Sequence, residues 1–125
     1  MIKKILLLEP NKALASIYRK ALQLHGYSVT HVMDSQAALH AADETPPDVI
    51  ILEPQIGMHG GIEFLHEFRS YTEWQKIPVI INSYIYSRAL REVERTLRRD
   101  FGVVECLYKP RTSLQELVTA VNKAV

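Results

Sequence analysis

Four polar residues stand at the ends of short apolar runs. Glu9 follows ILLL and Glu53 follows VIIL, while Ser83 closes VIINS and Lys109 comes two residues after VECL. If these runs are parallel strands of one sheet, the four side chains meet at its carboxyl edge, where such sheets carry their reactive crevice. Two carboxylates, a hydroxyl and an ammonium gathered there could bind a small ligand. Alternatively, Glu53 could form an ion pair directly with Lys109.

The apolar runs that would position these groups recur five times. They cover residues 5–8, 29–32, 49–52, 79–81 and 104–107. Three of them are almost continuous Ile, Leu and Val, which is typical of strands covered on both faces. The second run belongs to the segment SVTHV, whose alternation of apolar and polar residues predicts an edge strand.

Helical patterns fill the intervals between the runs. Gly26 ends the first predicted helix after His25, Ser35 caps a short second helix, and Ser113 forms a capping box with Glu116 in the fifth. The apolar residues expected to mark one face of the first, third, fourth and fifth helices are, in that order, Leu14, Ile17, Ala21 and Leu22; Ile62, Leu65 and Phe68; Leu90, Val93 and Leu97; and Leu114, Leu117, Val118 and Val121. Five alternations of strand and helix predict an α/β fold, a doubly wound five-stranded parallel sheet with five helices.

Composition limits the function classes. The 125 residues carry a formal net charge of +1 and are 47% apolar, which fits a single domain over residues 1–125. No apolar run reaches the roughly 20 residues that span a bilayer. Cys106 is the single cysteine, which excludes an internal disulfide and fits a reducing cytoplasm. We therefore expect a cytoplasmic domain that binds neither membrane nor, through bulk charge, nucleic acid.

The segment from Asp48 to Glu63, DVIILEPQIGMHGGIE, resembles the phospho-acceptor segment of bacterial response regulator receiver domains. In that family an Asp ends the strand, and a Gly-containing loop leads to a helix that opens with an apolar residue and Glu. The register matches without a gap and puts Glu53 in the place of the Asp. The resemblance covers nearly the whole chain and implies the flavodoxin-like receiver fold.

The resemblance also implies roles for the residues around Glu53. In the family, two adjacent acids after the first strand and the acceptor Asp bind a divalent cation, usually Mg²⁺. A Lys and a Ser or Thr hydroxyl stabilise the transferred phosphoryl group. The corresponding receiver-site residues here are Glu9, Pro10, Ser83, Tyr84, Cys106 and Lys109. Ser83 and Lys109 match the family pattern.

Four positions depart from that pattern. Pro10 replaces the second acid, Glu53 the acceptor Asp, Tyr84 a small residue and Cys106 the aromatic switch residue. Tyr84 is large enough to cover the site. We therefore predict a pseudo-receiver that is not phosphorylated, has lost its Mg²⁺ site, needs no cofactor and is not an enzyme. His59, Glu63 and His66 do not have the spacing of a zinc site.

An apolar and basic stretch follows Ser83. Its aromatic and Arg side chains are of the kinds that protein interfaces favour, and the predicted partner surface comprises Tyr84, Ile85, Tyr86, Arg91 and Arg95. The alternative is a solvated helix stabilised by ion pairs between Arg and Glu. The expected partner is a protein, an output domain or a second copy of the chain.

Three functions remain open from the sequence. The first is an interaction module in two-component-type signalling, without phosphoryl control. The second is a receiver that accepts a phosphoryl group on Glu53 from a histidine kinase, against which Pro10 and Tyr84 argue. The third is a nucleic-acid or small-ligand binder, supported by the Arg-rich stretch alone and weakened by its interleaved glutamates.

Overall fold

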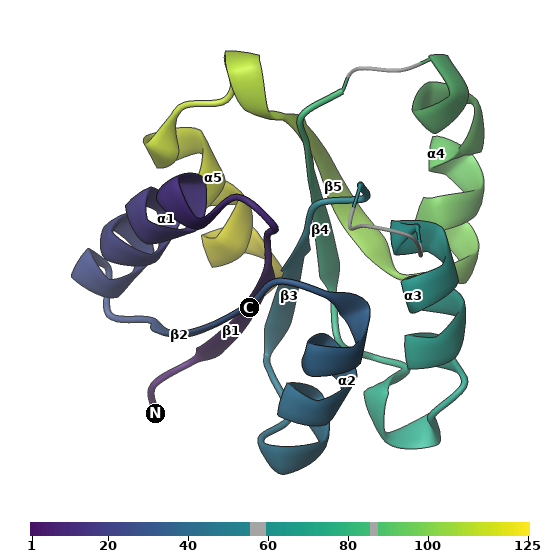
Figure 1. Ribbon diagram of the computed structural model, residues 1–125, viewed down its shortest axis with the longest axis horizontal. Coiled ribbons are helices and arrows are strands. Elements are labelled where there is room, and N and C mark those ends of the chain that lie inside the picture. Colours follow the sequence, from purple (N-terminus) through teal and green to yellow (C-terminus); the bar gives the residue numbers. More distant parts are fainter. Residues whose placement is uncertain (56–59, 86–87) are drawn as a thin grey trace.

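A computed structural model describes residues 1–55, 60–85 and 88–125 and shows strand and helix alternating along the chain (Figure 1). The strands are β1 (Lys4–Leu8), β2 (Ser28–Val32), β3 (Val49–Leu52), β4 (Val79–Ser83) and β5 (Val103–Tyr108). The helices are α1 (Lys12–Leu24), α2 (Ser35–Glu44), α3 (Gly61–Arg69), α4 (Arg88–Asp100) and α5 (Leu114–Ala124), with short 3₁₀ turns η1 (Thr72–Trp74) and η2 (Lys109–Arg111).

The five strands form one parallel sheet in the order β2-β1-β3-β4-β5, as the sequence predicts. The chain runs from β1 outward to β2 and then crosses back to β3, so the strand order reverses between β1 and β3. Leu8 pairs with Leu52 at the end of these two strands. Glu9 and Glu53 therefore emerge next to one another at the carboxyl edge, where a crevice is expected in such sheets.

Helices cover both faces of the sheet, with α1 and α5 on one side and α3 and α4 on the other (Figure 1). Alternate residues of each strand point into two separate clusters, so that Ile5 and Leu7 pack with α1 and α5 while Leu6 and Leu8 pack with α2, α3 and α4. This explains why the central strands are almost continuously apolar. None of the helices that the structure describes is long and apolar enough to cross a bilayer.

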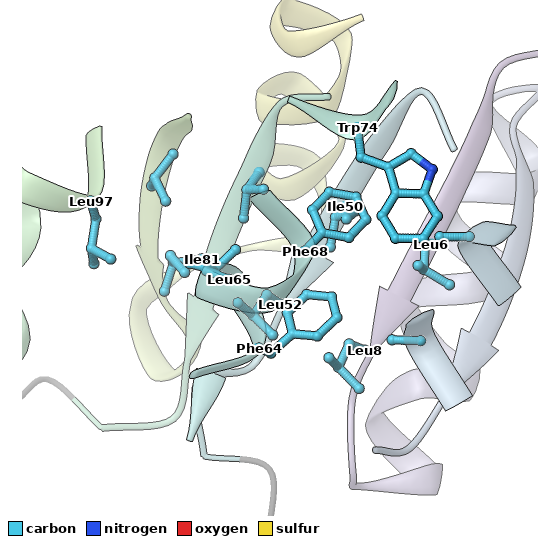
Figure 2. Packing of buried hydrophobic residues seen from close by; sticks show 14 residues of the cluster. Leu6, Leu8, Ile50, Leu52, Phe64, Leu65, Phe68, Trp74, Ile81 and Leu97 are labelled. Carbon is cyan, nitrogen blue, oxygen red and sulfur yellow. The ribbon is translucent and has the colours of Figure 1, made fainter. Parts of the chain in front are cut away.

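Stacked aromatic rings fill the larger cluster (Figure 2). The Phe68 ring lies between those of Phe64 and Trp74, with centroid distances of 5.5 and 4.9 Å. This arrangement anchors α3 and η1 under the sheet. The Phe68–Trp74 contact also fixes the chain just before β4, the strand that carries Ser83.

Arg69 joins three segments around this core. Its Nε donates to the carbonyl of Phe101 at 2.9 Å, and its two terminal nitrogens donate to the carbonyls of Trp74 and Ile77. Burial lowers the pKa of the Arg69 guanidinium. Gly102 has φ +67°, and a Cβ there would lie 2.5 Å from Arg69 Nη2. The turn into β5 therefore requires glycine both for its backbone and for its contact with Arg69.

Helix ends agree with the sequence in two cases and differ in one. Gly26, at φ +89°, follows α1, and Ser113 and Glu116 form the complete capping box of α5. At α2 the predicted cap Ser35 is wrong, because the Asp34 carboxylate accepts the Ala37 amide and Ser35 is already helical. Asp and Ser are comparably good N-caps, so the adjacent Asp34 and Ser35 left the first residue of α2 ambiguous from the sequence.

Several predicted face residues point outward. Ile17, Ile62 and Leu114 are 48%, 39% and 41% exposed. In α1 the buried residues are instead Ala15, Tyr18 and Leu22. The pattern misled because α1 buries a face centred on small and aromatic side chains, which leaves its largest β-branched residue on the outside.

Candidate functional site

The site lies at the carboxyl edge of the sheet, where the ends of β1, β3, β4 and β5 meet. Glu9 and Glu53 follow the adjacent strands β1 and β3, and Ser83 ends β4 opposite Tyr108 of β5. Lys109 follows Tyr108 directly. Parallel pairing therefore brings together the four polar groups that lie far apart in the sequence.

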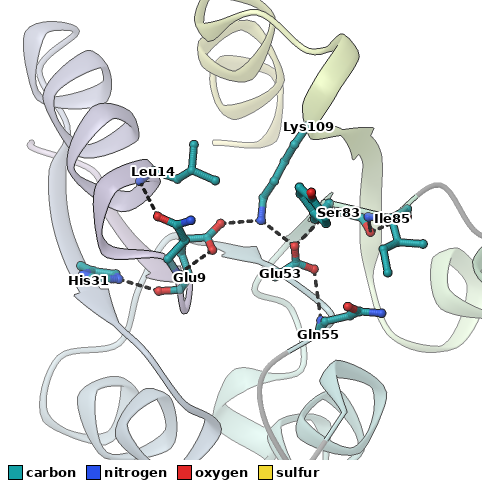
Figure 3. A network of polar contacts seen from close by, with 10 residues as sticks. Glu9, Leu14, His31, Glu53, Gln55, Ser83, Ile85 and Lys109 are labelled. Atoms are coloured by element: carbon teal, nitrogen blue, oxygen red, sulfur yellow. Dashed lines mark hydrogen bonds and ion pairs between the residues drawn. The ribbon is translucent and has the colours of Figure 1, made fainter.

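One ammonium joins the two carboxylates (Figure 3). Lys109 Nζ lies 2.5 Å from Glu53 Oε1 and 2.6 Å from Glu9 Oε1. The three side chains are only 6%, 4% and 3% exposed, respectively. The predicted contact between Glu53 and Lys109 is confirmed, and the contact between Lys109 and Glu9 is an addition that the sequence did not suggest.

The electrostatic balance of the cluster favours a charged lysine. Burial by itself lowers the pKa of Lys109. The hydrogen bonds and Coulomb attraction from Glu53 and Glu9 outweigh this desolvation, so that the pKa of Lys109 is raised above its ordinary value. With both carboxylates ionised the cluster carries a net charge of −1. Its charges are compensated by direct contact, which a buried site requires.

Backbone amides satisfy the remaining oxygens of the carboxylates. Glu53 Oε1 also accepts the Tyr84 amide at 2.9 Å, and Glu53 Oε2 accepts the Gln55 amide at 3.1 Å. Glu9 Oε2 accepts the Asn11 amide at 3.0 Å. Throughout the described residues, no buried side-chain nitrogen or oxygen lacks a hydrogen-bond partner. Both carboxylates are thus held in fixed orientations.

His31 is a site residue that sequence reasoning missed. Its Nε2 donates to the carbonyl of Glu9 at 2.7 Å, which requires the proton on that nitrogen (Figure 3). His31 pairs in register with Leu7, two residues before Glu9. The sequence did hold a signal for this role of His31. The residue lies near the end of the predicted edge strand, and the strand next to it in the sheet, β1, ends just before Glu9.

Ser83 is engaged locally. Its hydroxyl donates to the Ile85 carbonyl at 2.7 Å and accepts the Ile85 amide at 3.2 Å, which closes the turn after β4. Tyr84 contributes its backbone amide to Glu53, but the residue is 65% exposed. Its ring therefore lies mostly in solvent and does not cover the site as the sequence suggested.

Cys106 lies in β5 and lines a pocket of about 410 Å³ together with Leu90, Glu94 and Leu107. Burial, together with a hydrogen bond and Coulomb repulsion from Glu94, raises the pKa of Cys106 to about 12. The thiol is therefore protonated at neutral pH. This is unlike the lowered pKa of reactive cysteines.

The sequence-predicted partner surface is described in part. Tyr84 is 65% and Ile85 38% exposed, and Arg91 and Arg95 are exposed on α4. Tyr86 lies outside the described residues. Arg88 pairs with Glu92 at 3.3 Å, and Arg98 contacts both Glu94 and Glu105 at 4.0 and 3.5 Å. The helix therefore has both features proposed for it, ion pairs along its length and exposed Arg beside exposed apolar side chains.

Metal-ligating side chains form no cluster in the part of the chain that the structure describes. Within residues 1–55, 60–85 and 88–125, no three His, Cys, Asp or Glu side chains lie close enough to hold an ion together. Of the zinc ligands weighed from the sequence, His59 is not among these residues, and His66 packs edge-on against Phe101 with a centroid distance of 4.6 Å.

Known proteins share this fold. The chemotaxis protein CheY4 of Vibrio cholerae superposes with a TM-score of 0.87 over 100% of both chains at 21% sequence identity. A putative response regulator from Chloroflexus aurantiacus gives a TM-score of 0.87 over 99% of this chain and 98% of its own, at 18% identity. At these identities the likeness establishes the flavodoxin-like fold alone.

Sequence comparison establishes the family. The KDP operon transcriptional regulatory protein KdpE of Escherichia coli is 30% identical over 106 residues, which are 85% of this chain and 44% of that protein. The regulatory protein VirG of Agrobacterium tumefaciens is 23% identical over 99% of this chain and 44% of its own length. The chain thus spans less than half the length of these relatives. Residues 5–122 match the response regulator receiver domain, and the chain belongs to that family.

Proposed function

We propose that this receiver domain acts as a constitutive protein-interaction module and is not controlled by phosphorylation. The observation that carries the proposal is the position of Lys109 Nζ, 2.5 Å from Glu53 and 2.6 Å from Glu9. The Lys109 ammonium, the positive charge that phosphoryl transfer needs in this site, is already bound to the carboxylates of Glu9 and Glu53. The site is therefore occupied by its own ion pairs.

The donor set supports the loss of the divalent cation. Mg²⁺ requires near-octahedral oxygen ligands at about 2.0–2.1 Å. Pro10 offers no side-chain oxygen. Oε1 of Glu9 and Oε1 of Glu53 both bind Lys109. A cation placed between the two carboxylates would have to displace a buried ammonium. We infer that the residues present do not fit Mg²⁺, and the proposed function needs no metal.

The bonding of Glu53 supports the loss of phosphoryl transfer. Its two oxygens together accept the Tyr84 amide, the Gln55 amide and the Lys109 ammonium. These three contacts fix the orientation of the carboxylate, and small displacements of a reacting group from its productive geometry are costly. The Ser83 hydroxyl is also committed to the backbone of Ile85. Transfer would require rearrangement of several contacts at once.

The same contacts support constitutive binding at the end of β4 and along α4. Because the Tyr84 amide donates to Glu53, the ion pair of the site orders the backbone that presents the exposed Tyr84 and Ile85. Arg91, which lines a pocket together with Ile85, and Arg95 are exposed on α4. An aromatic anchor with nearby Arg is the composition of interface centres. We propose that a protein partner or an output domain binds this surface without a switching signal.

Intact-mass spectrometry tests the chemistry. The protein is incubated with acetyl phosphate or phosphoramidate and Mg²⁺, with Glu53→Gln and a receiver that retains the acceptor Asp as controls. We expect the mass of this chain to stay unchanged while the Asp-containing receiver gains one phosphoryl group. A gain that disappears in Glu53→Gln would overturn the proposal and establish phosphorylation on Glu53.

Amide chemical shifts test the cation separately. Titration with Mg²⁺ should leave the signals of Asn11, Gln55 and Tyr84 in place, because their amides donate to carboxylates that the Lys109 ammonium already binds. Saturable shifts confined to these amides would show that the site binds the ion. Shifts on adding an oligonucleotide would instead favour a nucleic-acid binder.

A further inference from the structure

A groove between α2 and α3 lies away from the Glu53 site and from the α4 surface. It has a volume of about 760 Å³, and its lining includes Asp34, Leu39, Asp43, Glu67, Tyr71 and Trp74. A smaller pocket of about 260 Å³ continues it and shares Gln36, Leu39 and Glu67. We call this continuous depression the α2–α3 groove.

The α2–α3 groove combines an apolar floor with an acidic rim. Trp74, at the base of the groove, is only 3% exposed, whereas Tyr71 is 43% exposed to solvent. The two pockets as described contain no Lys or Arg in their lining. In the described part of the chain, no cation lies within ion-pair distance of Asp34, Asp43 or Glu67. Asp43 and Glu67 thus form an acidic rim without an ion-pair partner in this part of the chain, whereas Asp34 caps α2 through the Ala37 amide and His40, which also lines the groove, pairs with Glu44.

The outer face of α1 has the complementary character. The helix carries Lys12, Arg19 and Lys20 and no Asp or Glu between residues 12 and 24. None of these three cations has an ion-pair partner among the residues described. Ile17 and Leu24 are 48% and 86% exposed, and their spacing with Lys20 places them on one stripe of the helix. A purely solvated helix does not need two large apolar residues on that stripe.

The two surfaces have matching lengths and lie on opposite faces of the sheet. A rise of 1.5 Å per residue puts Lys12 and Lys20 about 12 Å apart along α1 and Asp34 and Asp43 about 13 Å apart along α2. The helix α1 packs into one cluster of the core, whereas α2 and α3 pack into the other. One copy of the chain can thus offer α1 and the α2–α3 groove to different neighbours at the same time.

We infer that α1 of a second copy docks in the α2–α3 groove, so that the chains associate head to tail. Ile17 and Leu24 would contact the aromatic floor, and Lys20, which lies on the same stripe, would pair with the acidic rim. A helix laid apolar side down in a groove is a common mode of protein recognition. Because the two contacting patches differ, repetition closes into a ring or continues as a filament. The contact uses neither Glu53 nor α4 and is independent of the function proposed above.

Charge reversal with sedimentation velocity tests the inference. The variants are Lys20→Glu on α1 and Glu67→Lys on the groove, both at exposed positions, and the matched control is Arg88→Glu on the exposed start of α4. Circular dichroism and urea unfolding verify the fold of each. We expect the unmodified chain and the control to associate with rising concentration at low salt. We expect this association to weaken at about 1 M salt, where the Debye length is about 3 Å.

Each single variant should sediment as a monomer under the same conditions. An equimolar mixture of Lys20→Glu and Glu67→Lys should associate again, because the basic helix of one meets the acidic groove of the other. A monomeric unmodified chain at every concentration would overturn the inference. So would association that Arg88→Glu abolishes and Lys20→Glu leaves intact, since that result places the contact on α4.

Discussion

Lys109 Nζ lies 2.5 Å from Glu53 Oε1, and this contact joins the end of β5 to the end of β3 across the intervening strand β4. Both side chains are nearly inaccessible to solvent. The contact is therefore a structural tie between two strands that are not neighbours, and it lies in the candidate site. Its removal should affect the stability of the fold as well as the chemistry of the site.

Replacement of Lys109 by Met should destabilise the protein strongly. The substitution leaves Glu9 and Glu53 buried without a cation, and removing one partner of a buried ion pair typically costs about 3–5 kcal/mol. Urea unfolding at neutral pH measures the change in the free energy of unfolding. The Lys123→Met variant, on the exposed end of α5, controls for loss of a positive charge. A loss below about 1 kcal/mol at Lys109 would mean that solvent reaches the cluster.

The stabilisation by Lys109 should disappear at high pH. Because the folded pKa of Lys109 is raised above the ordinary value of 10.5, its contribution is fully present below pH 10.5 and is lost as the pH rises through the folded value. The difference in unfolding free energy between the unmodified chain and Lys109→Met should therefore be constant from pH 7 to about 10 and shrink above that. A difference that grows with pH in the alkaline range would contradict the raised pKa.

On the proposed function, two substitutions together should confer receiver chemistry. Glu53→Asp shortens the acceptor and Pro10→Asp supplies the missing carboxylate, which gives the donor set that the family uses for Mg²⁺. We expect the double variant to gain one phosphoryl group from acetyl phosphate in the presence of Mg²⁺, whereas Glu53→Asp alone gains little. Intact mass and its dependence on Mg²⁺ are the measurements. Equal labelling of the single and double variants would show that Pro10 is not what prevents the reaction.

Arg69 and Gly102 should be energetically coupled. Arg69→Met leaves three carbonyls without their donor and should cost about 3 kcal/mol or more. Gly102→Ala should cost about 1–3 kcal/mol from its backbone conformation, plus the clash of the new Cβ with Arg69. In the Arg69→Met background the clash is relieved, so the second penalty should be smaller. Additive losses in this double-mutant cycle would show that the two residues do not interact.

Cys106 should react slowly with thiol reagents in the folded protein. Its pKa of about 12 keeps the thiolate scarce at neutral pH, and the side chain is partly buried between β5 and α4. The rate of reaction with a disulfide reagent should rise with pH well beyond the ordinary thiol range and reach the free-cysteine value only after unfolding in guanidinium. Fast reaction of the native protein at pH 7 would instead support a redox role.

Partner binding should depend more on Tyr84 than on the charges of α4. Tyr84 is the exposed aromatic next to the site, and an anchor of this kind is worth about 2 kcal/mol or more at the centre of an interface. Arg91 at the rim should mainly alter association rate and salt dependence. Pull-down with an identified partner compares Tyr84→Ala, Arg91→Ala and Glu53→Gln. Binding abolished by Glu53→Gln but unaffected by Tyr84→Ala would place the function in the crevice instead.

Apolar patterning along the chain was enough to predict the fold and to group four of the site residues, though not His31. Continuous Ile, Leu and Val runs separated by helical patterns admit few arrangements other than a doubly wound parallel sheet, and parallel strands bring their carboxyl ends to one edge. Glu9, Glu53, Ser83 and Lys109 could therefore be grouped from the sequence alone. The places of Pro10 and Cys106 in the site could likewise be predicted from their positions relative to the strand ends.

Strand order and packing set how these groups contact one another. Lys109 binds Glu9 as well as Glu53 because β1 and β3 are adjacent and end in register at Leu8 and Leu52, a relation that depends on strand order. The outward position of Ile17 depended on which face of α1 meets the sheet. Apolar spacing within a helix limits the possible buried faces, but packing against the neighbouring strands selects one of them.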